Sequence, residues 1–189
     1  VMDNKSYPEK IRDLGRLALA RAEIAREKSN PEQAEEETRY QPQEEEAPHT
    51  AGTAEERLLA FIGGKAESAL LMDAFNILLE EDIFQTNPQA LEKLNGWVKA
   101  RDASRQPAAM YAMGSLLLEK DDLSGAVKMA EEGLSKYPQS LPVQILSLNT
   151  ITVLLDKNRL QDAERLISKY PGSSPVSYTH LRAHETPEH

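Results

Sequence analysis

The chain has 189 residues, a net charge of −9 and no cysteine. The lack of cysteine excludes disulfides, thiolate metal sites and a cysteine nucleophile. An acidic chain without basic clusters repels phosphate backbones, so nucleic-acid binding is not expected. Only 5% of the residues are aromatic although 40% are hydrophobic, a balance that favours a helical protein rich in alanine and leucine over an enzyme with a deep pocket.

No stretch approaches 18 apolar residues and no apolar signal-peptide core precedes or follows Pro8, so a cytoplasmic protein without a membrane association is predicted. Residues 1–40 are predicted to form an amphipathic helix and a short polar helix. The first begins at the capping-box pattern of Ser6 and Glu9 and runs to about Lys28. Its apolar positions recur at helical spacing, at Ile11, Leu14, Leu17, Ala18, Ile24 and Ala25.

Residues 41–52 are predicted to be a disordered acidic linker, because two prolines and a glutamate run accompany no large apolar residue. Thr53 and Glu56 then form a second capping-box pattern, which begins a helix that Gly63–Gly64 ends. A longer helix is predicted from about Lys65 to Glu81. Its expected buried residues are Leu70, Ala74, Ile77 and Leu78 or their neighbours.

Another helix is predicted to start at Asn87–Pro88 and to carry Leu91, Leu94, Trp97 and Val98. Beyond it, a ten-residue segment recurs after 37 positions: residues 117–126 read LLEKDDLSGA and residues 154–163 read LLDKNRLQDA. The tetrapeptide SKYP also occurs twice, at 135–138 and at 168–171. A repeat of this length indicates stacked supersecondary units, and helical stacks of this kind mostly bind other chains. Ala90 lies 36 residues before Ala126, which suggests that 65–102 is a degenerate copy.

Residues 107–138 resemble a tetratricopeptide repeat. Counted from Pro107, small residues fall at positions 8, 20 and 27 and a proline falls at position 32, namely Gly114, Ala126, Gly133 and Pro138. Small side chains let two antiparallel helices approach closely, and the proline stops the second helix. The resemblance is clear over 107–171. It implies an all-α, right-handed solenoid of antiparallel helix pairs, within a truncated repeat domain over 53–172.

The sequence departs from the family pattern at several places. Met110 stands where the family usually has tryptophan, and Ala130 stands where it has an aromatic residue. In the second copy Ile151 occupies the first small position, and the second helix is expected to be four residues shorter. These departures are typical of a terminal or atypical repeat.

In tetratricopeptide-repeat proteins the first helix of each repeat lines a concave groove that holds a peptide. The resemblance therefore implies a groove lined by positions 5, 9, 12 and 13 of each copy, with an asparagine at position 6 of the second. These residues are Tyr111, Ser115, Leu118, Glu119, Leu148, Asn149, Thr152, Leu155 and Asp156. Glu119 and Asp156 would favour a basic or neutral helical peptide. Alternatively, the leucines pack between repeats and the polar residues are solvated.

No catalytic, cofactor-binding or metal-binding residue is predicted, and the chain is not predicted to be an enzyme. Gly63-Gly64-Lys65-Ala66 lacks the upstream glycine and the hydroxyl residue of a phosphate-binding loop. The acidic run of residues 80–82 is expected to be solvated, His49 to lie in the linker, and Trp97 to be part of the core.

Residues 176–186 resemble a translated sequencing-library adapter, so 173–189 is predicted to be a non-native, disordered tail. Three of the four histidines, His180, His184 and His189, belong to this tail. The expected function is a scaffold or adaptor that binds a peptide or partner segment. Two alternatives stay open: an accessory repeat region of a larger enzyme, for example a bacterial glycosyltransferase, or a structural subunit of an assembly. Self-association through an uncovered face at Leu154, Leu160 and Ile167 is also predicted.

Overall fold

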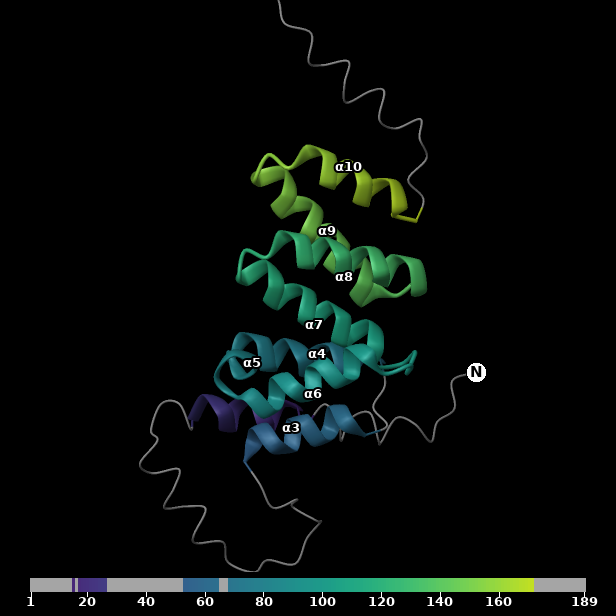
Figure 1. The fold of residues 1–189 in the computed structure, drawn as a ribbon. Coiled ribbons are helices and arrows are strands. Elements are labelled where there is room, and N and C mark those ends of the chain that lie inside the picture. The colour runs from purple at the N-terminus through teal and green to yellow at the C-terminus, as the bar shows by residue number, and fades with distance from the viewer. Residues whose placement is uncertain (1–14, 16, 27–52, 65–67, 172–189) are drawn as a thin grey trace, which may run out of the picture. The chain divides into compact units, whose positions relative to one another are not determined.

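The computed structural model describes residues 15, 17–26, 53–64 and 68–171 (Figure 1). Within these ranges the regular secondary structure is entirely helical and contains no strand, which confirms the all-α prediction. The predicted capping box at Ser6, the linker with His49, and the adapter-like tail lie outside the described residues.

The chain divides into two compact units between Gly96 and Trp97. This boundary falls inside the range 53–172 that the sequence predicted as one repeat domain. Unit 1 comprises the described residues up to 96, and unit 2 comprises residues 97–171.

Unit 1 contains a helix over 17–26, followed by α3 (Ala54–Gly63), α4 (Ser68–Glu80), α5 (Ile83–Thr86) and most of α6 (Pro88–Lys99). The predicted capping box at the start of α3 is confirmed. The Glu56 amide donates to Oγ1 of Thr53 over 3.2 Å, and the Thr53 amide donates to the Glu56 carboxylate over 3.1 Å. The helix ends at Gly63 as predicted, but Gly64 has a φ of −82° and makes no use of glycine's left-handed freedom.

The core of unit 1 contains all four residues predicted to be buried in α4, namely Leu70, Ala74, Ile77 and Leu78. Phe75 of α4 packs on Phe84 of α5 with 6.3 Å between ring centroids. The helix over 17–26 belongs to the same unit, since Arg21 pairs with Glu80 over 2.7 Å and Glu23 pairs with Arg57. This helix buries Leu17, Ala20 and Ile24, whereas Ala18 and Ala25 are exposed.

Unit 2 is built from α7 (Gln106–Glu119), α8 (Leu123–Lys136), α9 (Leu141–Asp156) and α10 (Leu160–Lys169). The helices α7, α8 and α9 all pack against one another, and α10 packs against α8 and α9 (Figure 1). The second helix of the second copy has 10 residues against 14 in α8, as predicted. Both helices stop two residues before the proline of the SKYP tetrapeptide.

Close packing in unit 2 depends on the small residues of the first copy. Gly114 lies against Leu146 of α9, and Gly133 lies against Val143. Ala126 and Ala163 are buried as well. At Gly114 and Gly133 a larger side chain would meet α9, so these two glycines let α9 approach α7 and α8 closely.

The turns after α4, α7 and α9 share one unusual backbone feature. Asp82, Asp121 and Asn158 have φ angles of 56°, 57° and 56°, in the left-handed region that aspartate and asparagine tolerate better than most residues. In the two later turns the following amide donates to a carbonyl five residues earlier, Asp122 to Leu117 and Arg159 to Leu154. These bonds form the Schellman arrangement that satisfies the last carbonyls of a helix.

This shared turn has a sequence signature of its own, which the 37-residue recurrence alone does not reveal. Residues 78–82 read LLEED, residues 117–121 read LLEKD and residues 154–158 read LLDKN. The earlier hairpin is therefore better aligned through Asp82 and Asp121, 39 positions apart, than through Ala90 and Ala126. The short helix α5, which was not predicted, accounts for the three additional residues between turn and alanine.

A buried glutamine holds the start of unit 2 together. Gln106 is 4% exposed; its Nε2 donates to the Val98 carbonyl over 2.6 Å and its Oε1 accepts from the Tyr137 hydroxyl. One side chain thus joins the last turn of α6, the first turn of α7 and the cap of α8. Because both Nε2 and Oε1 of Gln106 are hydrogen-bonded, burying this amide costs little, and its two bonds hold Val98 and Tyr137 next to the start of α7.

Candidate functional site

The helix α9 carries apolar residues on both its buried and its exposed side. Ser147 and Thr150 are completely buried, whereas three leucines on the same helix are about half exposed. The two buried hydroxyls donate to carbonyls four residues earlier in their own helix, Val143 and Leu146, over 2.8 Å each. Because their hydroxyls are bonded within the helix, Ser147 and Thr150 can lie in a packed interface. The packing of α9 against its neighbours thus does not depend on the three exposed leucines.

The exposed leucines of α9 are seven residues apart. Leu141, Leu148 and Leu155 are 61%, 50% and 49% exposed. Ile145 and Thr152 lie between them at helical spacing and are also partly or fully accessible. The Thr152 hydroxyl donates to the Leu148 carbonyl over 3.0 Å, so its hydrogen-bonding need is met within the helix. We call these five residues, Leu141, Ile145, Leu148, Thr152 and Leu155, the leucine face.

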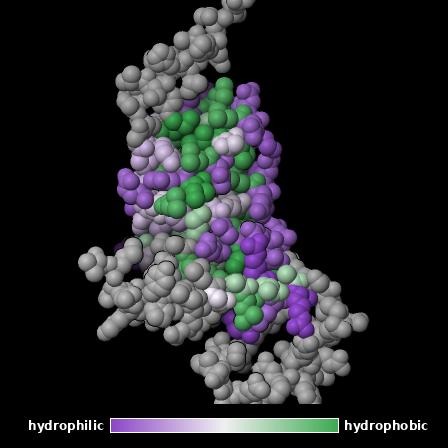
Figure 2. All heavy atoms as spheres, turned by 180° about the vertical axis from the view of Figure 1, so that it is seen from behind, coloured by the Kyte–Doolittle hydropathy of each residue, from purple (hydrophilic) through white to green (hydrophobic). Residues whose placement is uncertain are grey.

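Seen in Figure 2, hydrophobic side chains gather on one face of the part of the molecule in which α7–α10 lie. Single exposed apolar residues are common on protein surfaces, whereas a contiguous exposed apolar surface is unusual. The leucine face is a contiguous surface of this kind. It runs along the whole of α9, which has 16 residues.

The structure sorts the predicted groove residues into two groups. Tyr111 packs against the cluster around Leu146, and Leu118 packs against the cluster around Leu154; with Ser115, both are half-buried. In contrast, the remaining residues of the set are exposed, namely Glu119, Leu148, Asn149, Thr152, Leu155 and Asp156. The alternative that the leucines pack between repeats therefore holds for Leu118, whereas Leu148 and Leu155 are exposed.

Carboxylates lie at one end of this surface, each followed directly by a lysine, Lys120 and Lys157, of which Lys157 pairs with Asp121 over 3.0 Å. Glu119 and Asp156 are the last residues of α7 and α9, and neither helix has a basic residue in its last turn. The C-terminal end of a helix carries a partial negative charge from its macrodipole, so each carboxylate adds to a charge of its own sign. A cation or the positive N-terminal end of another helix would be attracted to this end.

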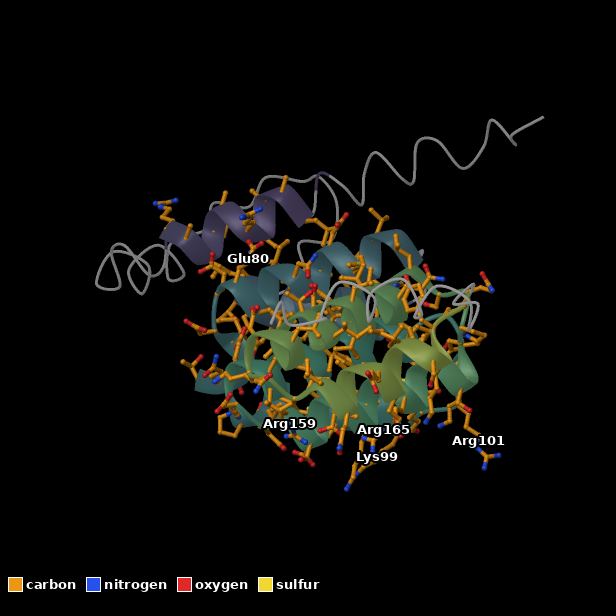
Figure 3. The ribbon with its side chains drawn as sticks, turned by 90° about the horizontal axis from the view of Figure 1, so that it is seen from above. Glu80, Lys99, Arg101, Arg159 and Arg165 are labelled. Carbon is orange, nitrogen blue, oxygen red and sulfur yellow. The ribbon has the colours of Figure 1, made fainter. Side chains whose placement is uncertain are left out.

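The cations of α10 lie elsewhere and are paired within unit 2. Arg165 and Lys169 pair with Glu131 of α8 over 2.9 and 3.1 Å. Arg159 and Arg165 also pair with Asp162, the latter over 3.1 Å. Figure 3 shows Arg159 and Arg165 on the same side of unit 2 as Lys99 and Arg101. The carboxylates bound to Arg165 of α10 and to Arg159, which precedes this helix, reduce what this side could offer to a polyanion.

The acidic run of residues 80–82 lies at the C-terminal end of α4. Glu80 forms an ion pair with Arg21, and Asp82 is exposed and precedes α5. Among the described residues, no group of histidine and carboxylate side chains is arranged to hold a metal ion. Trp97, predicted to be part of the core, is only half-buried. Of the GGKA segment, Lys65 and Ala66 lie outside the described residues.

The face predicted for self-association is partly wrong. Leu154 is fully buried in a cluster with Leu123, Val127 and Ala163, because α9 turns this residue toward α8 and α10. Leu160 is 52% exposed, and Ile167 is partly buried against the cluster around Leu146. The accessible apolar surface thus lies on the opposite side of α9 from Leu154.

In the part of the chain that the structure describes, no helix has the length and apolar character needed to cross a membrane. Comparison with protein-family models, with curated proteins and with solved structures found no match to this chain.

Proposed function

We propose that the chain is a protein-interaction module whose leucine face binds an apolar segment of a protein partner. The observation that carries this proposal is the row of half-exposed leucines on α9, Leu141, Leu148 and Leu155, on a helix that already buries a separate apolar side. Burying a leucine side chain contributes about 1.5–3 kcal/mol. Such side chains in water at regular spacing are the usual basis of a docking surface.

We also propose that α7–α10 are two tetratricopeptide-like repeats of a right-handed solenoid. The 37-residue recurrence and the close approach of helices at Gly114 and Gly133 support this. The partner segment is then a helix laid along α9, because the apolar positions follow the 3–4 spacing by which helices are recognised. Asp156 and Glu119 favour a basic or neutral segment over an acidic one.

A displayed peptide library tests this function. Peptides of 16 residues, the length of α9, are selected on the full chain, and the binders are compared on three variants. Leu148→Glu and Leu155→Glu place a charge in the leucine face. Leu160→Glu is the matched control, because Leu160 is equally exposed but lies on α10.

The proposal expects binders that the wild-type chain and the Leu160→Glu variant retain and that both face variants lose by at least about tenfold, which corresponds to 1.4 kcal/mol. The enriched peptides should have apolar residues at 3–4 spacing. Selection of binders that ignore both face variants, or failure to select any binder, would overturn the proposal.

A further inference from the structure

We infer that the occupant of the leucine face is the leucine face of a second copy of this chain, with the two α9 helices antiparallel about a two-fold axis near Leu148. This inference rests on the proposed function, since it names the partner of the same surface. Three features of α9 carry it: the residue types along the face, their spacing about Leu148, and the charges at the two helix ends.

The residue types match the seam of a two-stranded coiled coil. Leu141, Leu148 and Leu155 stand seven residues apart, and Ile145 and Thr152 follow the first two by four. In heptad terms the leucines occupy d and the β-branched residues Ile145 and Thr152 occupy a, which is the spacing of a coiled-coil seam. The three leucines and Thr152 of the seam are exposed on α9, and Ile145 is partly accessible. A helix with the same seam is thus a complementary partner, and α9 itself has it.

The three leucines are spaced symmetrically about Leu148, while Ile145 lies three residues before it and Thr152 lies four residues after it. Leu141 precedes it by seven residues and Leu155 follows it by seven, a separation of about 10 Å along the helix axis in each direction. Under a two-fold axis through this point, Leu148 meets Leu148 of the other copy and Leu141 meets Leu155. Surfaces of this self-complementary kind are what a two-fold dimer requires.

The charges favour the antiparallel arrangement, since Lys157, which follows Asp156, is paired with Asp121 of its own chain. Asp156 ends α9, and Ser140 begins it without a side-chain hydrogen bond to the first turn. Antiparallel pairing brings each Asp156 toward the positively polarised N-terminal end of the other α9, where a carboxylate is favourable. Parallel pairing would bring the two Asp156 carboxylates together. The net charge of −9 and the small number of seam residues predict a weak dimer, which forms in the micromolar range, about 8 kcal/mol.

Sedimentation velocity across a concentration series of the full chain tests the dimer. We expect the sedimentation coefficient to rise from monomer to dimer. Leu148→Glu should raise the dissociation constant at least about a hundredfold, because the two-fold axis sets the new carboxylates against each other, and Leu148→Lys should do the same. An equimolar mixture of the two variants should dimerise again. Leu160→Glu should leave the wild-type behaviour unchanged.

Cysteine cross-linking tests the direction of pairing, and the chain is suited to it because it contains no cysteine. We expect Leu141→Cys mixed with Leu155→Cys to form a mixed disulfide under mild oxidation. Neither variant alone should link efficiently. Linking of Leu141→Cys with itself would instead show a parallel pair and overturn the inferred geometry.

The outcomes separate this inference from the function on which it rests. A chain that stays monomeric to high concentration, yet binds library peptides through Leu148, overturns the second copy as occupant and keeps the binding function. A dimer that Leu160→Glu abolishes and Leu148→Glu spares places the contact on α10 and also overturns the inference. Circular dichroism of each variant shows that it remains folded.

Discussion

Gly114 of α7 and Leu146 of α9 lie so close that a Cβ atom on the glycine would come within 3.0 Å of three carbon atoms of the leucine side chain. Leu146 is fully buried, so it has little room to move away. The two residues thus set the separation of α7 and α9, and with it the placement of the surface these helices form.

The first prediction concerns Gly114→Ala. Alanine is about 1 kcal/mol better than glycine within a helix, but overpacking a rigid core costs about 1–3 kcal/mol. We expect the free energy of unfolding to fall by about 1 kcal/mol, measured by urea denaturation with circular dichroism. Gly96→Ala is the control, because nothing lies within 4 Å of its Cβ position. That variant should be as stable as the wild type or more so; equal gains for both would contradict the close packing.

The second prediction concerns Gln106. Gln106→Ala leaves the Val98 carbonyl and the Tyr137 hydroxyl without the bonds they make with this side chain. Because unsatisfied buried polar groups are costly, we expect a loss of about 2–3 kcal/mol in the free energy of unfolding. Gln144→Ala removes a bond to the Pro138 carbonyl at a more accessible position and should cost less than about 1 kcal/mol. Similar losses in the two variants would argue against Gln106 as the link between helix ends.

The third prediction concerns the turn between α9 and α10. Asn158 has a φ of 56°, where an alanine is disfavoured by about 1 kcal/mol. Asn158→Ala should therefore lower the melting temperature, whereas Asn158→Gly should stay close to the wild type because glycine adopts this conformation freely. The neighbouring Lys157 has a φ of −87°. At that position the order of the two substitutions should reverse, with glycine the more destabilising.

The fourth prediction concerns Asp102. The hydroxyl and the amide of Ser104 donate to its carboxylate over 2.7 and 3.1 Å, and they lower the pKa of Asp102 below 3.8, with a smaller contribution from Arg105. A depressed pKa stabilises the folded chain above the unfolded value, and this stabilisation is lost as the pH falls through the folded value. Carboxyl titration by nuclear magnetic resonance should show the Ser104→Ala variant titrating closer to 3.8 than the wild type. Ser168→Ala, on α10, should leave the titration unchanged.

Much of the fold could be predicted from sequence because local rules agreed with packing. The capping box at Thr53, the small residues at Gly114 and Gly133, and the shorter second helix of the later copy each follow from a few neighbouring residues. The helix α5 was not predicted from the sequence, because four residues are too few to show a periodic pattern. The related turn at Asp82 was not predicted, because the spacing of Ala90 from Ala126 places Asp82 out of register with Asp121.

The candidate site was predictable only in part. Family resemblance selected Leu148 and Leu155, but periodicity could not show which side of α9 faces water, since both sides carry apolar residues. The deciding facts are the burial of Ser147 and Thr150 and the close approach at Gly114. These depend on neighbouring helices, and the same contacts explain why Leu154 was wrongly assigned to an uncovered face.

The last prediction compares two leucines of α9 that differ in surroundings. Leu154 is fully buried, so Leu154→Ala should cost about 2–5 kcal/mol of the free energy of unfolding. Leu148 is half exposed, and Leu148→Ala should cost less than about 1 kcal/mol at concentrations where the chain is monomeric. Urea denaturation of both variants at low protein concentration measures the two values. If they were equal, the leucine face would be part of the hydrophobic core, and a binding surface at this position would have no physical basis.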